Sequence, residues 1–112
     1  MAVDFLRGKG LRILARNYRF KKKEIDIIAE DKGTICFVEV KTRTSKGFGY
    51  PEEAVTEEKK KNLVTLAINY IKKFGLTGHN VRFDVISILW ERKKPVLNYI
   101  KNAFIAEDFW TI

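Results

Sequence analysis

Apolar and polar residues alternate through the first half of the chain in the pattern of a β-sheet. The alternation covers residues 11–20 and continues over residues 24–43, where β-branched and aromatic side chains fill many apolar positions. Gly33 lies within the second stretch and can take the positive φ of a tight turn, so we expect two paired strands there. The first half therefore predicts three successive strands.

A long amphipathic helix is predicted in the second half. Apolar residues recur there at intervals of three and four, which places them on one side of a helix. Pro51 and Thr56 are both candidate starts, because proline is tolerated in a first turn and threonine is a good N-cap. Gly75 is expected to end the helix. Its apolar side consists of Leu63, Leu66, Ala67, Tyr70, Ile71 and Phe74.

The remaining elements complete an α/β fold. Residues 1–8 predict a short helix, and residues 81–90 and 96–100 predict two strands. The order of helix, three strands, helix and two strands suits a mixed central β-sheet flanked by helices. At 112 residues the chain is long enough for a single domain over residues 1–112.

Composition is typical of a soluble globular domain, and it excludes a disulfide and some kinds of metal site. Hydrophobic residues make up 46% of the chain and charged residues 32%, and no apolar run approaches the roughly 20 residues that span a bilayer. The chain has one cysteine, Cys36, and one histidine, His79, which excludes an intrachain disulfide and a zinc site rich in these residues. Because the N-terminus shows no signal-peptide pattern, we expect a cytoplasmic protein without a membrane partner.

Positive charge is concentrated at the N-terminal end. Residues 1–23 hold eight Lys or Arg and one acidic residue, a net +7, so the rest of the chain contributes only +1 to the total of +8. Such a segment attracts polyanions, and counterion release makes that attraction sensitive to salt. We therefore expect a nucleic-acid partner, with a generally basic surface as the alternative. A membrane surface is less favoured, because these residues lie mostly on a predicted strand and not on an amphipathic helix.

Acidic and basic residues interrupt the paired strands at matching positions. Side chains two residues apart share a face, so Glu24 and Asp26 point together, as do Glu39 and Lys41. If the strands pair through the turn, Asp26 and Glu39 come within reach of one cation, and two carboxylates suit Mg²⁺ or Mn²⁺. Lys41 beside such an ion can act on an attacking water, as in metal-assisted phosphodiester hydrolysis. A solvated ladder of surface ion pairs is the alternative, although Phe37 on the same face favours a cleft.

These residues resemble a known motif. The run Glu24-Ile-Asp26-Ile-Ile, followed by Phe37-Val-Glu39-Val-Lys41-Thr-Arg43, is similar to the PD-(D/E)XK pattern of restriction-endonuclease-like proteins. Nearly the whole chain resembles one branch of them, the small YraN-like family. The other segments that carry this resemblance are residues 12–19, 47–49, 55–59, 82–85 and 99–104.

The resemblance implies a restriction-endonuclease-like core and a role for each site residue. Asp26 and Glu39 would bind Mg²⁺ or Mn²⁺ with the Val40 carbonyl as a third ligand, Lys41 would act on the water, and Glu24 would be a secondary or outer-shell ligand. Residues expected to contact nucleic acid are Arg16, Arg19, Lys22, Lys23, Arg43 and Lys59.

Two further expectations come from the same resemblance. Arg82 and Asp84, which share a face and can pair with each other, are candidates for a supporting role near the site. Family members carry a Glu on the first helix that faces the metal, and this sequence begins after that position. We therefore expect the first helix to be truncated at its N-terminus and the fourth acidic ligand to be missing.

Three functions follow from these patterns. The first is a Mg²⁺- or Mn²⁺-dependent nuclease that hydrolyses phosphodiester bonds in DNA, with branched or repair-related DNA among its candidate substrates. A homodimer is an open expectation here, since junction-cleaving relatives of this fold typically work as dimers. The second is a non-catalytic nucleic-acid-binding protein with a degenerate nuclease site, which the missing glutamate favours. The third is a protein-interaction subunit that docks through Phe104, Phe109 and Trp110.

Overall fold

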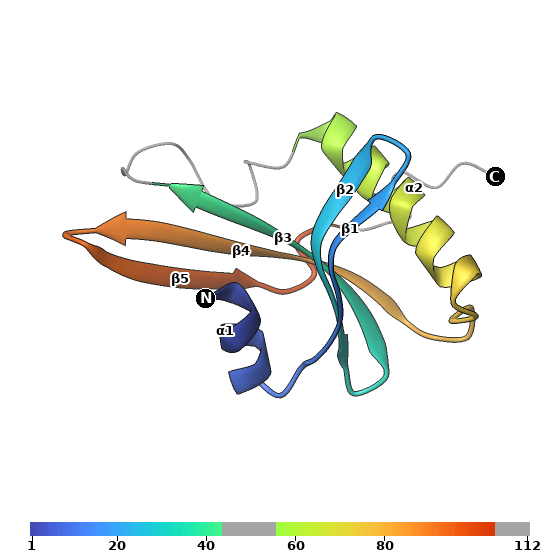
Figure 1. The fold of residues 1–112 in the computed structure, drawn as a ribbon, viewed down its shortest axis with the longest axis horizontal. Helices are drawn as coiled ribbons and strands as arrows, with labels where there is room; N and C mark the ends of the chain where they lie inside the picture. Colours follow the sequence, from blue (N-terminus) through green and yellow to red (C-terminus); the bar gives the residue numbers. More distant parts are fainter. Residues whose placement is uncertain (44–55, 105–112) are drawn as a thin grey trace.

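A computed structural model describes residues 1–43 and 56–104 of the chain (Figure 1). The elements follow one another in the predicted order. They are α1 (Ala2–Gly8), β1 (Arg12–Phe20), β2 (Lys23–Asp31), β3 (Thr34–Arg43), α2 (Glu57–Lys73), β4 (Val81–Glu91) and β5 (Lys94–Ile100). The helix start expected at Pro51 and the docking residues Phe109 and Trp110 lie outside the described residues.

All five strands of the described ranges form one mixed sheet in the order β1-β2-β3-β4-β5. Neighbouring strands are antiparallel except β3 and β4, which run parallel. A parallel pair requires a crossover connection, and the chain between β3 and β4 includes α2. The predicted mixed sheet with flanking helices is therefore confirmed.

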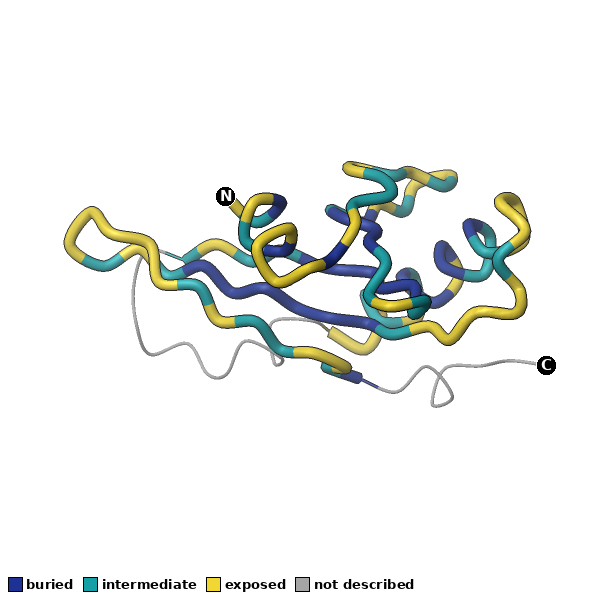
Figure 2. The backbone as a smooth tube through the Cα atoms, turned by 90° about the horizontal axis from the view of Figure 1, so that it is seen from below, coloured by how far each residue is buried: buried dark blue, intermediate teal, exposed yellow. Residues whose placement is uncertain are grey.

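The two helices pack on opposite faces of the sheet (Figure 1). On one face α2 packs on a cluster that includes Phe37 and Phe83, and on the other α1 buries Val3 and Leu6. The central strands β3 and β4 are buried over most of their length, as the dark blue segments of Figure 2 show. Neither α1 nor α2, the helices of the described ranges, is long and apolar enough to cross a membrane.

The ends of α2 follow from its local sequence. The side chain of Thr56 accepts a hydrogen bond from the backbone N–H of Lys59 at 3.1 Å, so the N-cap predicted at Thr56 is confirmed. The helix ends at Lys73, and Gly75 follows it with φ +68°. Phe74 was expected on the buried side, but it lies past the last helical residue and is 51% exposed.

The alternation on β1 is interrupted by a β-bulge. The register with β2 shifts between Ile13 and Ala15. As a result Ile13 packs on the α1 face, whereas Leu14 and Ala15 both pack on the α2 face. The alternation expected over residues 11–20 would place Ile13 and Ala15 on one face; this is wrong, because one extra residue turns the following side chains to the other face.

Candidate active site

The candidate site lies where β2 separates from β3. Their antiparallel ladder ends at the pair Ile27↔Val38, and Asp26 and Glu39 are the next residues in that register. β3 continues beyond this point paired with β4 alone. Oδ2 of Asp26 accepts a hydrogen bond of 2.7 Å from the backbone N–H of Val40. The Asp26 side chain thus joins the two strands where their backbones stop pairing.

Glu39 is a buried carboxylate next to Asp26. It is only 4% exposed, and its Oε2 lies 2.6 Å from Nζ of Lys59. The contact is an ion pair without hydrogen-bond alignment, so within the described part of the chain Oε2 has no hydrogen-bond donor. Burial, followed by the neighbouring Asp26 carboxylate, raises the pKa of Glu39 to about 7, while Lys59 acts against this rise.

Two lysines complete the cluster. Lys41 projects from β3 near Lys59, and burial and the Lys59 ammonium lower the pKa of Lys41. Burial also acts to lower the pKa of Lys59, but the contact with Glu39 outweighs it and raises that pKa. The predicted residues Asp26, Glu39, Lys41 and Lys59 are therefore brought together at one point.

The donor set fits a hard divalent cation that keeps much of its water. Within residues 1–43 and 56–104 no group of three or more His, Cys, Asp or Glu side chains could hold a metal ion. The site offers two carboxylates, Asp26 and Glu39, to which the resemblance adds the Val40 carbonyl. Mg²⁺ typically binds through one or two carboxylates together with water and substrate phosphate. The Oε2 atom of Glu39 is buried and, among the described residues, has the ion pair with Lys59 but no aligned hydrogen-bond donor, so it is an oxygen that a cation could bind.

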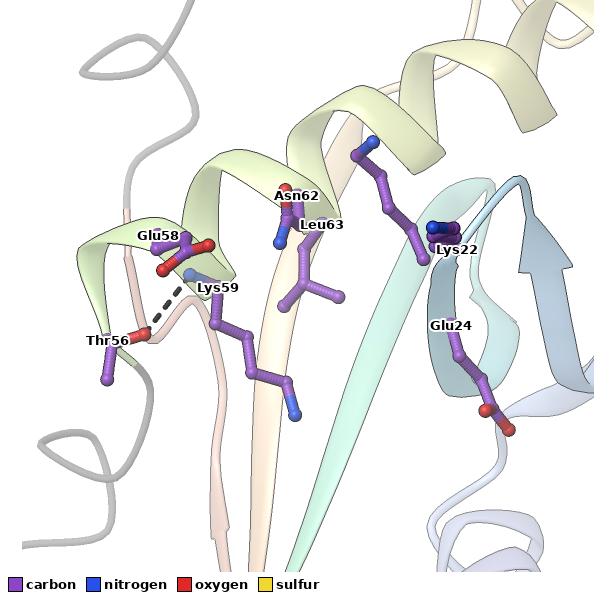
Figure 3. A pocket seen from close by; sticks show the side chains of 8 residues that line it. Lys22, Glu24, Thr56, Glu58, Lys59, Asn62 and Leu63 are labelled. Atoms are coloured by element: carbon purple, nitrogen blue, oxygen red, sulfur yellow. Dashed lines mark hydrogen bonds between the residues drawn. The ribbon is translucent and has the colours of Figure 1, made fainter.

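A basic groove of about 400 Å³ lies beside the cluster. Figure 3 shows Lys59 extending from the first turn of α2 into the space before the strands, while Lys22 and Glu24 come from the β1–β2 hairpin. Two of the other predicted nucleic-acid contacts, Arg16 and Arg19, are exposed on β1. The groove is lined by Lys22, Lys23, Glu24, Thr56, Glu58, Lys59, Asn62 and Leu63.

Two predicted residues lie outside the carboxylate cluster. Glu24 is half-exposed and pairs with Arg19 at 3.3 Å, so it borders the groove and its outer-shell role stays a prediction. Arg43 is half-buried at the end of β3, in register with Leu89 of β4.

Comparisons with known proteins identify the family of the chain. The family model described as "Uncharacterised protein family UPF0102" matches residues 1–88. The chain belongs to this family. Similar proteins include a UPF0102 protein of Persephonella marina, 48% identical over 103 residues that cover 92% of this chain and 85% of that protein. A UPF0102 protein of Clostridioides difficile is 46% identical over 104 residues, with 93% and 90% covered. UPF0102 is the YraN family, so the resemblance is confirmed.

Two solved structures are more distantly similar. SfsA of Pyrococcus furiosus in complex with Ca²⁺ matches 89% of this chain at a TM-score of 0.40 and 14% identity. The crystal structure of SSO0001 matches 88% at a TM-score of 0.39 and 18% identity. The chain covers 58% and 43% of these two proteins respectively. The function of this UPF0102 chain has therefore to be argued from its own residues.

Asn17 lies next to the site in the strand register, and the sequence interpretation gave it no role there. Tyr18↔Ile25 and Arg16↔Ile27 are paired, so Asn17 lies opposite Asp26 in the β1–β2 register. Asn17 has φ 51°, a left-handed conformation that asparagine tolerates better than most residues. The signal in the sequence was a lone asparagine among alternating strand residues, next to a strand that carries the carboxylates.

The conformation of Asn17 gives a testable difference between two substitutions. Asn17→Ala should lower the free energy of unfolding by about 1 kcal/mol, because a Cβ without a polar group disfavours positive φ. Asn17→Gly should cost less than Asn17→Ala, since glycine adopts this φ freely. Urea unfolding of both variants measures the difference. Equal stability of the two would show that the backbone at this position does not require positive φ.

Arg82 and Asp84 form a separate cluster on the opposite face of the sheet. Asp84 is buried and accepts hydrogen bonds from Arg82 Nε at 2.9 Å, from the Tyr99 hydroxyl at 2.5 Å and from the Asn102 backbone N–H at 2.9 Å. Asp84 lies two residues before Ile86 on β4, so both side chains point to the α1 face of the sheet. Glu39 points to the opposite face, toward α2. The supporting role suggested for this pair near the site is therefore wrong, and the alternative, that Arg82 and Asp84 pair with each other, is what the structure shows.

Proposed function

We propose that this protein is a Mg²⁺- or Mn²⁺-dependent nuclease that hydrolyses phosphodiester bonds in DNA. The convergence of Asp26, Glu39, Lys41 and Lys59 beside a basic groove is the observation that supports it. Placing a carboxylate pair out of water costs free energy, so a fold that keeps one has a use for a bound cation. Ammonium groups beside that cation favour an anionic substrate, and a phosphate group can bind the cation and the ammonium groups together.

The carboxylates and the carbonyl would hold the cation. Asp26 and Glu39 supply the negative charge, and the Val40 carbonyl is the expected third protein ligand. A divalent cation bound there would stabilise negative charge on the phosphate and lower the pKa of water. The hydrogen bond from the Val40 N–H fixes one oxygen of Asp26 and so sets the orientation of its carboxylate.

The lysines have different tasks. Lys59 retains its proton because of Glu39, so its Nζ can bind a non-bridging phosphate oxygen. Lys41 lies near enough to share this site, and burial and Lys59 make its amine easier to deprotonate. Neutral Nζ of Lys41 accepts a proton from the water that attacks phosphorus, while the bond from phosphorus to the leaving sugar oxygen breaks and that oxygen takes a proton from solvent.

DNA is the favoured polyanion because the basic groups continue away from the cluster. Lys22 and Lys23 line the groove beside Lys59, and Arg16 and Arg19 extend the charge along β1. Phosphates spaced along a nucleic acid can bind these groups in sequence, which a small phosphoester cannot do. The resemblance to nucleases favours DNA, including branched or repair-related DNA.

A non-catalytic DNA-binding protein is the second candidate. The ion pair between Lys59 and Glu39 supports it, because an ammonium already balances the charge of the carboxylate. In that case DNA binding would depend steeply on salt and would not respond to Mg²⁺ or Mn²⁺.

A plasmid-nicking assay separates the two candidates. Supercoiled plasmid incubated with the full chain should be nicked in Mg²⁺ or Mn²⁺ and remain intact in EDTA. DNA binding measured in EDTA should persist in both cases and weaken with salt. Intact plasmid under all metal conditions, with binding retained, would favour the non-catalytic protein over the nuclease.

Replacement of Lys41 by methionine tests its proposed task. Lys41→Met should lower the cleavage rate about 10²-fold, as expected for loss of a general base, and should remove the rise of rate with pH that the lowered pKa of Lys41 implies. A quenched-flow or gel assay over pH 6–9 measures both, with Lys61→Met, an exposed lysine of α2, as the control. An unchanged rate and pH profile for Lys41→Met would contradict the assignment.

A further inference from the structure

The hairpin of β4 and β5 extends beyond the rest of the described sheet. The last pair between β3 and β4 is Arg43↔Leu89, and within the described ranges residues 90–95 pair only inside the hairpin itself. Figure 1 shows this hairpin pointing away from both helices, and Figure 2 shows its tip exposed. A projecting hairpin adds little to the core, and Arg92, Lys93 and Lys94 at its tip are exposed.

The turn at the tip keeps basic residues in an unfavourable conformation. Arg92 and Lys93 have φ values of 48° and 64°, both in the left-handed region. Two-residue turns of this kind strongly favour Asn-Gly. The turn between β2 and β3 follows that preference at its second position, where Gly33 comes after Lys32. Backbone strain kept at an exposed basic tip is a pointer to function.

The hairpin presents Lys94 on the same face as the candidate site. Lys94 and Val96 share a face of β5 with Ile100, because even numbers of residues separate them, and Ile100 packs on the α2 face. Glu39 also faces α2. Arg92 and Lys94 line a common hollow of about 430 Å³ with Glu91 and Val96.

The distance along the sheet matches the geometry of a DNA duplex. Lys41 is in register with Ser87, and the turn residue Arg92 follows five residues later, just past the end of β4 at Glu91, so it lies at most about 17 Å further along at the rise of a strand. A turn of B-DNA is about 34–36 Å long, so this is about half a turn, or roughly five base pairs.

The geometry points to the β4–β5 hairpin as a second nucleic-acid contact that binds the backbone of duplex DNA about half a turn from the candidate site. This inference rests on the proposed function and names the form of its substrate. A duplex is stiff over this length and holds its phosphates at fixed separations, so one phosphate can lie at the site while another lies at the hairpin tip. Arg92, Lys93 and Lys94 supply the positive charge at the tip.

Replacing the turn residues tests the inference without destabilising the fold. The double variant Arg92→Asn and Lys93→Gly installs the residues that the turn favours, so its Tm should rise by about 4 °C or more. Its affinity for a fluorescent 20-base-pair duplex in EDTA and low salt should fall about tenfold. The slope of log affinity against log salt should become shallower by about two, as expected for two lost phosphate contacts.

A matched control removes the same charge elsewhere. Lys72→Gln with Lys73→Gln lowers the net charge equally at the exposed C-terminal end of α2 and should change affinity less than twofold. The loss in the hairpin variant should also be smaller for a 20-nucleotide single strand. Unchanged duplex binding, an equal loss in the control, or an equal loss for the single strand would overturn the inference. Because DNA binding is measured in EDTA, the result for the hairpin does not depend on whether the protein cleaves DNA.

Discussion

Replacing Asp26 by asparagine is expected to lower the metal-dependent cleavage rate by about 10³-fold or more. The substitution removes one of the two negative charges that would hold the cation, leaving Glu39 and a neutral amide. The fold should survive, because the amide oxygen of asparagine can still accept the hydrogen bond from the Val40 N–H. DNA binding in EDTA should stay within about twofold, since the basic groove is unchanged.

Asp4→Asn is the matched control for this substitution. Asp4 is an exposed carboxylate in the first turn of α1, away from the groove, and its replacement changes the net charge by the same amount as Asp26→Asn. Single-turnover cleavage by wild type, Asp26→Asn and Asp4→Asn gives the comparison, with Tm as the check on folding. Cleavage by Asp26→Asn at the wild-type rate would remove Asp26 from the site.

Replacing Glu39 by glutamine should have the largest effect on stability, and the size of that effect depends on pH. The pKa of Glu39 is raised by burial and by Asp26 from an ordinary value of 4.5 to about 7. The folded protein therefore holds a proton that the unfolded chain releases between these two values. Wild-type stability from this group is fully present below pH 4.5 and falls as the pH rises to about 7. The fall should be on the order of 3 kcal/mol.

The variant lacks this titration. The difference in free energy of unfolding between Glu39→Gln and wild type should therefore shift by on the order of 3 kcal/mol in favour of the variant between pH 4 and pH 8. Urea unfolding at both pH values measures the shift, and Glu58→Gln, an exposed carboxylate of α2, is the control. A difference that does not change with pH would mean that Glu39 titrates normally in the folded state.

The arrangement of the two carboxylates could be predicted from the sequence because it depends on short-range rules. A period of two, together with a tight turn at Gly33, fixes the register of β2 on β3, and that register brings Asp26 opposite Glu39. The cap at Thr56 was predictable for the same reason, since it depends on a side chain and a backbone N–H three residues apart.

The contacts that depend on distant parts of the chain were harder to predict. The resemblance singled out Lys59, but its ion pair with Glu39 depends on where the crossover places the first turn of α2 over β3. The β-bulge of β1 leaves little trace in the apolar pattern because it shifts the register by a single residue, and the left-handed Asn17 leaves little trace because the register is the same on both sides of it. The cluster around Asp84 likewise forms across strands that are separated in sequence.

Calorimetric titration with Mn²⁺ tests most directly whether the two carboxylates form a cation site. At pH 8 the wild-type protein should bind about one Mn²⁺, and the bound ion should raise its Tm, because a ligand that binds only the folded state stabilises it. Asp26→Asn and Glu39→Gln should each lose this heat, whereas Asp4→Asn should keep it. Binding of Mn²⁺ to both site variants with wild-type heat, or no binding to wild type in the presence of DNA, would contradict the site.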